Sequence, residues 1–160
     1  MAYDFERKID DVVDVLRSAK ARKGAVILLG AGCSKTAGIP LADDFCTIIK
    51  ERYPLDYNRA KRLGKTSYQH LMAEISAGER RDPLAEYIDN AKLNWAHIAL
   101  ATLIKEGYIA RVLTPNFDPL VVQACALLNE FPAIYDFAAS QTFKPDFVPT
   151  PAVYYLHGQR

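Results

Sequence analysis

Residues 28–40, LLGAGCSKTAGIP, limit how this chain can fold more than any other stretch. They overlap the end of AVILLG, residues 25–30, a continuous apolar run typical of a strand buried in a parallel sheet. Three glycines and a proline at this point indicate a tight turn from the strand into a helix. Pro40 suits the first position of that helix, which we expect to continue to about Tyr53.

The rest of the chain alternates helical patterns with short apolar runs. Helices are predicted over residues 3–21, 93–106 and 116–130, and strands over 108–114, 132–137 and 152–158. Residues 54–92 are polar and predict short helices that form a cap or small module. The alternation predicts an α/β fold, a Rossmann-like parallel sheet with helices on both faces. We expect one domain over residues 1–160, with the helical cap at about 54–92.

Composition narrows the classes of partner. A net charge of +1 gives no electrostatic case for nucleic acid or an anionic membrane surface. No apolar stretch approaches the length of a membrane span, and the N-terminus lacks the apolar core of a signal peptide. Cys33, Cys46 and Cys125 are far apart and odd in number, so neither a local zinc site nor a disulfide framework is indicated. We therefore predict a cytoplasmic protein without a metal site.

Polar clusters follow three of the predicted strands, at residues 30–38, 114–118 and 157–158. The carboxyl ends of parallel strands share one edge of the sheet, and ligands bind outside that edge. The sequence therefore predicts a ligand site where these clusters meet.

The glycine turn is suited to phosphate, because exposed backbone N–H groups and the start of a helix favour an anion. It fits a triphosphate-binding loop poorly, since Leu29 and Ser34 stand where that motif has glycines. It fits the dinucleotide fingerprint in part: Gly30 and Gly32 match, while Lys35 takes the third position. From this stretch alone, a tight turn that binds nothing stays open.

Three motifs together resemble the sirtuin family. GAGCSKTAGIP matches every fixed position of the family's first signature, Gly-Ala-Gly-x-Ser-x-x-x-Gly-Ile-Pro. TPNFD, residues 114–118, is similar to Thr-Gln-Asn-x-Asp with Pro115 in place of Gln, and HG at 157–158 resembles the family's His-Gly pair. The motifs come in the family's order. They cover almost the whole chain but only the first part of the family's domain.

The resemblance implies an NAD-binding fold that breaks the bond between nicotinamide and ribose. Departure of nicotinamide leaves a cationic sugar, so fixed polar groups around the ribose suit the reaction. A general base that is neutral near pH 7 suits it as well, and an imidazole with a pKa of about 6.5 meets that need. His157 would be the general base, and Asn116 would hold the nicotinamide ribose or the attacking water. The residues that would contact NAD are Gly30, Ala31, Gly32 and Ser34 near the pyrophosphate, Ile39 and Pro40 beside nicotinamide, Thr114, and Asp118 at the carboxamide.

Simpler roles stay open for the same side chains. Asp118 precedes Pro119 and suits a helix N-cap, a role that is compatible with ligand binding. Asn116 suits a turn between strand and helix. His157 at a strand end suits a bond to a nearby carbonyl group. His70 and His97 lie in helical segments, and we expect each to be exposed or bonded to a partner rather than catalytic.

The chain departs from deacylating sirtuins after Pro40. They continue with Asp-Phe-Arg, whereas this chain reads LADDF over residues 41–45, and it lacks their two zinc-binding cysteine pairs. AGIPLADDF is more similar to the sirtuin-like NAD hydrolases of bacterial anti-phage systems. That resemblance implies an NAD glycohydrolase that releases nicotinamide and ADP-ribose and depletes NAD in anti-phage defence. The alternatives are a protein deacylase, an ADP-ribosyltransferase, or a non-catalytic module that senses NAD or ADP-ribose.

In the family, the segments that contact the adenosine half of NAD follow His-Gly, and this sequence ends at Arg160. A sheet of so few strands would also keep an exposed edge. We therefore expect a homo-oligomer, or a further domain or subunit, to complete the fold. Alone, the chain is expected to bind NAD weakly and turn over little.

Overall fold

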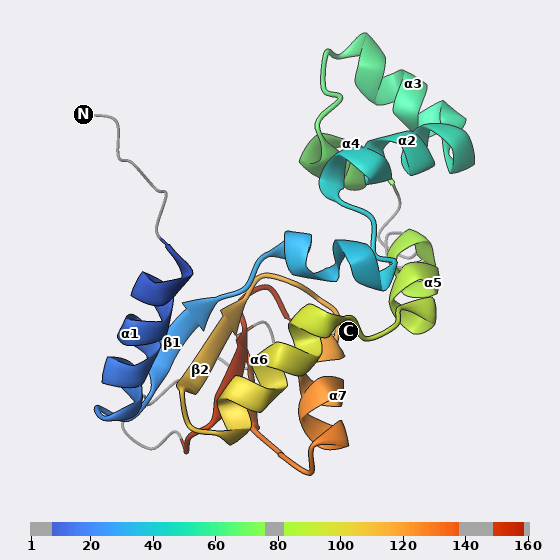
Figure 1. The fold of residues 1–160 in the computed structure, drawn as a ribbon. Helices are drawn as coiled ribbons and strands as arrows, with labels where there is room; N and C mark the ends of the chain where they lie inside the picture. Colours follow the sequence, from blue (N-terminus) through green and yellow to red (C-terminus); the bar gives the residue numbers. More distant parts are fainter. Residues whose placement is uncertain (1–7, 76–81, 138–148, 159–160) are drawn as a thin grey trace, which may run out of the picture. The chain divides into compact units, whose positions relative to one another are not determined.

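The computed structural model describes residues 8–75, 82–137 and 149–158 of the chain. These residues form two compact units (Figure 1). The first unit draws on Met1–Gly30 and Leu93–Arg160, and the second on Ala31–Lys92.

The first unit is a sheet of four strands that all pair in parallel, in the order β1-β2-β4-β3. Helix α1 contacts β1 and β2, and α6 and α7 pack side by side on the other face (Figure 1). The predicted α/β, Rossmann-like parallel sheet with helices on both faces is therefore confirmed. Its elements are α1 (Ile9–Lys20), β1 (Ala25–Leu28), α6 (Trp95–Lys105), β2 (Ile109–Thr114), α7 (Leu120–Leu127), β3 (Ala133–Asp136) and β4 (Ala152–Tyr155).

One apolar core lies between the sheet and helices α6 and α7. Val112 of β2 pairs in register with Val153 of β4, and both are fully buried beneath the two helices. All four residues of β4 are buried, which explains why AVYY reads as a continuous apolar run. The helices contribute Leu100, Ala101 and Ile104 from α6, and Val121, Ala124 and Cys125 from α7.

The second unit is helical over its described residues. Helices α2, α3 and α4 enclose a small core of Ile49, Ala60, Leu71 and Ile75, and Phe45 packs edge-on against Tyr87 with ring centroids 5.7 Å apart. Its elements are η1 (Ala31–Ala37), α2 (Ala42–Arg52), α3 (Pro54–Arg62), α4 (Tyr68–Glu74) and α5 (Asp82–Asn90). The short helices predicted for 54–92 are present, and the compact unit also includes η1 and α2.

Several predicted element boundaries are wrong. The helix predicted over 116–130 is observed only as α7, Leu120–Leu127. Helix α2 starts at Ala42 rather than Pro40, because the Asp44 carboxylate accepts a hydrogen bond from the Leu41 N–H at 3.0 Å and places the N-cap at Leu41. Strand β4 ends at Tyr155 rather than at residue 158, since the chain turns at His157 and Gly158 has a φ of +92°. The predicted helix over 3–21 is observed from Ile9, and residues 3–7 lie outside the described residues.

No helix in the described ranges combines the length and the apolar character needed to cross a bilayer.

Candidate functional site

The carboxyl end of β1 is tied to that of β2 by hydrogen bonds beyond the strand pairing. The Leu29 N–H donates to the Leu113 carbonyl at 2.9 Å. The Thr114 hydroxyl then donates to the Leu29 carbonyl at 2.9 Å, and Thr114 is buried. This side chain therefore fixes the point at which the chain leaves β1 for the glycine turn.

Asn116 is held at the same point. Its backbone N–H donates to the Thr114 hydroxyl at 3.1 Å, and its side-chain Nδ2 donates to the Gly30 carbonyl at 3.2 Å. The residue is only 8% exposed. The structure thus brings together three predicted residues from two motifs, Gly30 from the first and Thr114 and Asn116 from the second, in one hydrogen-bonded junction.

Asp118 is buried just ahead of α7. Its Oδ1 accepts a hydrogen bond from the Leu120 N–H at 3.2 Å, so the carboxylate does serve the start of the helix. The N-cap position itself is occupied by Pro119.

His157 lies in the exposed turn after β4. Its ring lies beside that of Phe117, with centroids 6.5 Å apart and an angle of 34° between the ring planes. Phe117 stands between Asn116 and Asp118 in the sequence, so the His-Gly turn lies next to segment 114–118. Strand order explains this placement, because β4 pairs directly with β2 and Thr114 is in register with Tyr155.

The remaining predicted residues lie in the second unit. Ala31 and Gly32 in η1 are exposed, whereas Ser34 is buried. The Ile39 N–H donates to the Ser34 carbonyl at 3.2 Å and closes the end of η1. A surface pocket of this unit is lined by Lys35, Gly38, Ile39, Pro40, Asp44, Thr47 and Ile48, so both residues predicted to contact nicotinamide border a pocket.

Neither close packing nor a left-handed backbone requires a glycine at Gly30 or Gly32. A Cβ atom placed on either would meet nothing within 4 Å, and neither has a left-handed backbone. At Gly24, in contrast, a Cβ would lie 2.9 Å from the Ala110 Cβ, and Gly38 has a φ of +101°. Packing and backbone conformation therefore account for Gly24 and Gly38 but not for Gly30 and Gly32.

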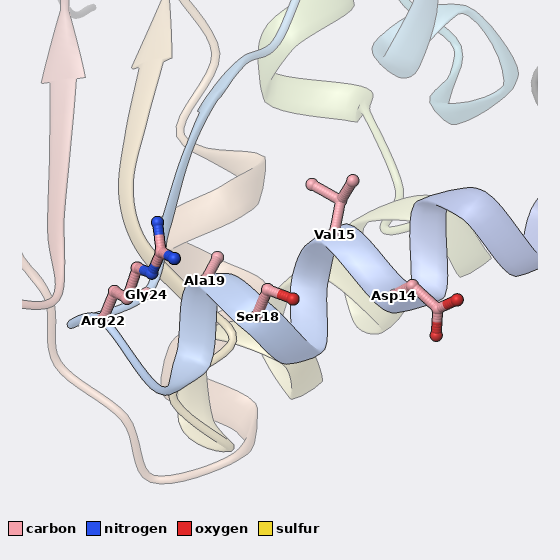
Figure 2. Close-up of a pocket in the computed structure, with 6 residues that line it drawn as sticks. All are labelled: Asp14, Val15, Ser18, Ala19, Arg22 and Gly24. Atoms are coloured by element: carbon pink, nitrogen blue, oxygen red, sulfur yellow. The ribbon is translucent and has the colours of Figure 1, made fainter.

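Another pocket of the first unit holds none of the predicted residues. Asp14, Val15, Ser18, Ala19, Arg22 and Gly24 line it (Figure 2). Figure 2 shows Val15 and Asp14 pointing to opposite sides of α1, so the side chains do not converge on a common point. This pocket lies before β1, at the amino end of the sheet, and is not the candidate site.

Two buried polar side chains behind the edge were not predicted as part of the site. His97 and Tyr155 are fully buried, and burial lowers the pKa of His97 and raises that of Tyr155. The negative charge of Asp118 raises the pKa of Tyr155 further. At His97 the same charge opposes the effect of burial, which remains the larger one. The sequence carries a signal for His97 only: Asn94 and His97 have the spacing of a capping box.

No group of three or more His, Cys, Asp or Glu side chains within the described ranges could hold a metal ion. Cys33, Cys46 and Cys125 are not joined in disulfide bonds, and burial raises the pKa of Cys125 to about 11.

Comparisons with known proteins give the family context. No protein-family model matches the sequence. The NAD-dependent protein deacetylase 3 of Pseudomonas syringae pv. tomato is 32% identical over 115 residues, which is 71% of this chain and 38% of that protein. An NAD-dependent protein deacetylase of Haloarcula marismortui is 35% identical over 113 residues, or 70% of this chain and 40% of that protein. The chain is homologous to the sirtuins.

A third relative, the NAD-dependent protein deacylase SIR2rp2 of Leishmania major, is 30% identical over 126 residues, with 71% of the sirtuin-like chain and 35% of the relative covered. Among solved structures, one described as "The Structural basis for Sirtuin Substrate affinity" gives a TM-score of 0.48 at 25% identity, over 96% of this chain and 45% of that one. A Sir2–p53 peptide–NAD+ complex gives a TM-score of 0.41 at 27% identity, over 74% of this chain and 42% of that one. The sirtuin-like chain thus spans about 40% of the length of the first two relatives.

Proposed function

We propose that the protein binds NAD at the carboxyl edge of the sheet and breaks its nicotinamide–ribose bond. The observation that carries the proposal is the bond from Asn116 Nδ2 to the Gly30 carbonyl at 3.2 Å. It joins the glycine turn to segment 114–118, and the His157 ring lies beside the same segment. The relatives named above are NAD-dependent enzymes by their names, which supports NAD as the substrate.

Residue chemistry at this edge suits that reaction. An asparagine held by the backbone presents its amide in a fixed orientation, which favours hydrogen bonding to a ribose hydroxyl or a water molecule. His157 is exposed and therefore accessible as a base. Asp118 is buried beside them, and we assign it to the nicotinamide carboxamide.

Backbone at the glycine turn is the proposed contact for the pyrophosphate. The space beside the Gly30 Cα is open, so a phosphate oxygen can approach its main chain without meeting a side chain. In the second unit, Gly32 has the same property, Ala31 is exposed and Ser34 is buried. The backbone of η1 rather than the Ser34 hydroxyl therefore carries the expected phosphate contacts there, while Ile39 and Pro40 remain the proposed nicotinamide contacts.

For the acceptor, we propose acyl-lysine, and hence NAD-dependent protein deacylation. This choice follows the names of the relatives, which are deacetylases and a deacylase. The sequence after Pro40 favours a second candidate, hydrolysis of NAD by water. Residues 41–45, LADDF, lack the arginine of Asp-Phe-Arg, and Asp44 within them is engaged at the helix cap. As an NAD glycohydrolase, the protein would act as an NAD-depleting effector in anti-phage defence.

The experiment incubates the full-length protein with NAD, with and without an acetyl-lysine peptide, and measures nicotinamide and free lysine. Peptide deacetylation in step with nicotinamide release supports the deacylase. Nicotinamide and ADP-ribose released at the same rate without peptide support the hydrolase. ADP-ribose attached to a protein would indicate transfer, and binding of NAD or ADP-ribose without any product would indicate a sensing module.

The partner predictions belong to the same proposal. NAD and ADP-ribose are the expected ligands. A second copy of the chain, or a further domain or subunit, is expected to pair with the sheet, whose outermost strands are β1 and β3. Sedimentation of the full-length protein with and without NAD tests for the oligomer. We place the protein in the cytoplasm, which localisation of a tagged copy tests.

A further inference from the structure

Phe117 is an exposed aromatic residue between the two buried polar residues of segment 114–118. Its exposed fraction is 38%, whereas that of Asn116 is 8% and that of Asp118 is 6%. Packing in the core therefore does not determine which side chain stands at position 117. What the ring contacts on the surface of the first unit is the relevant question.

The ring of Phe117 lies beside the imidazole of His157. The two centroids are 6.5 Å apart, which is within the range of about 4.5–7 Å over which aromatic rings attract each other. Within the described ranges, no hydrogen bond or ion pair engages the His157 side chain. The Phe117 ring is therefore a contact that can limit the rotation of an otherwise exposed imidazole.

The backbone on both sides of Phe117 is fixed by hydrogen bonds. Ahead of it, the Asn116 N–H donates to the Thr114 hydroxyl at 3.1 Å. Behind it, the Leu120 N–H donates to Asp118 Oδ1 at 3.2 Å. The direction in which the Phe117 side chain leaves the backbone is thus set by its neighbours in the sequence.

The turn that carries His157 is fixed to the same strand end. The Leu156 N–H donates to the Thr114 carbonyl at 2.8 Å, and Gly158, buried on the other side of His157, has a φ of +92°. Thr114 therefore holds the segment of Phe117 through its hydroxyl and the turn of His157 through its carbonyl group. With both backbones held, the side-chain rotation of His157 is the freedom that the ring contact can restrict.

We propose that Phe117 is a positioning residue, whose ring holds the His157 imidazole beside segment 114–118 in the orientation that a general base requires. The use of His157 as a base rests on the proposed function, whereas the contact between the rings does not require NAD. A base that spends more of its time in the reactive orientation raises kcat, and Phe117 does this without touching the substrate.

The first test is kinetic and compares substitutions of Phe117 in the full-length protein. Phe117→Ala removes the ring, and we expect kcat for nicotinamide release to fall about fivefold with KM for NAD within about twofold of the parent value. Phe117→Tyr keeps the ring and should restore the parent kcat.

Phe137→Ala is the matched control for the loss of a partly exposed ring. Phe137 is 40% exposed, and its ring packs on that of Tyr154, with centroids 6.2 Å apart. Its substitution should leave kcat for nicotinamide release unchanged.

The second test measures the contact itself in the absence of NAD. The imidazole C–H signals of His157 in a proton NMR spectrum are assigned by their loss in His157→Ala. Because the ring current of a phenyl group displaces the signals of protons beside it, Phe117→Ala should move the His157 signals. Phe117→Tyr and Phe137→Ala should leave them near their parent positions.

The proposal is overturned if Phe117→Ala leaves the His157 signals in place, or if it moves them while kcat stays at the parent value. A rise in KM with kcat unchanged also overturns it, since the Phe117 ring would then contact the substrate directly. A parent protein that releases no nicotinamide would remove the proposed function, while displaced His157 signals in Phe117→Ala would still support the positioning of the imidazole by Phe117.

Discussion

Replacing Thr114 by valine removes one hydroxyl that takes part in two hydrogen bonds at the junction of the motifs. As a donor, the hydroxyl holds the Leu29 carbonyl at 2.9 Å, and as an acceptor it holds the Asn116 N–H at 3.1 Å. Thr114 is 2% exposed, so water is excluded from the position that the hydroxyl leaves. Valine has nearly the same shape, which keeps packing effects small.

The expected loss of stability follows from these two bonds. Each lost bond contributes about 1 kcal/mol, and a buried N–H left without an acceptor costs about 1–3 kcal/mol. We therefore expect Thr114→Val to lower the free energy of unfolding by about 3 kcal/mol. For a domain of this size, that corresponds to a fall in melting temperature of about 6–12 °C.

Thr114→Ser is the matched control, because it keeps the hydroxyl and removes only a methyl group. It should lower the free energy of unfolding by about 1 kcal/mol. Thermal unfolding followed by circular dichroism, together with urea titration, measures both variants. Equal stabilities for the valine and serine variants would refute the role assigned to the hydroxyl.

Three further predictions follow from the site and its surroundings. Gly30→Ala should leave the melting temperature within about 2 °C of the parent, since the space beside its Cα is open. The same substitution should weaken NAD binding at least tenfold in a calorimetric titration. Unchanged affinity would exclude close approach of a ligand to the Gly30 main chain. Cys125 should resist iodoacetamide at pH 8 in the folded protein and react after unfolding, because burial raises its pKa to about 11, and mass spectrometry of the labelled peptide checks this. Burial lowers the pKa of His97 in the folded state, so the unfolded chain takes up a proton first as the pH falls through about 6.5. The melting temperature should therefore drop over that pH range. His97→Gln should flatten this pH dependence of the melting temperature, and an identical slope in the variant would contradict the prediction.

Much of the fold could be predicted because its central strands, β2 and β4, are buried. The expectation of a buried strand is wrong for β1, where Val26 and Leu28 are exposed. AVYY at the start of the predicted strand over 152–158 is apolar throughout, and all four residues are buried in the structure. The predicted end of that strand and the predicted start of α2 are wrong, because the local geometry of a turn and of a side-chain hydrogen bond sets these two boundaries. The Asp44 carboxylate, which bonds the Leu41 N–H, sets the start of α2 at Ala42.

The convergence of the motifs could be predicted from a parallel sheet alone. Since β1, β2 and β4 are neighbours, the residues that follow them meet at one edge, and Asn116 contacts Gly30 there. The particular bonds could not be predicted, because the turn after β2 depends on a Thr114 hydroxyl that serves two partners.

The buried polar residues behind the site could not be identified from the pattern. Tyr155 fits the apolar pattern of its strand. The one sequence signal for His97 is its capping-box spacing from Asn94, which does not reveal that its side chain is buried. Their relation to Asp118 arises only when α6 and α7 pack together over β4. Residues far apart in sequence then share one buried environment.

Nicotinamide release from NAD by the full-length protein, compared with its Asn116→Ala and His157→Ala variants, tests the central claim most directly. We expect each substitution to lower kcat/KM by at least about 100-fold while the protein stays folded. His70 is an exposed histidine of α4 that is hydrogen-bonded to Ser67. His70→Ala is therefore the matched control and should retain the parent rate of nicotinamide release. Folded Asn116→Ala and His157→Ala variants that release nicotinamide as fast as the parent would contradict the assignment of the site.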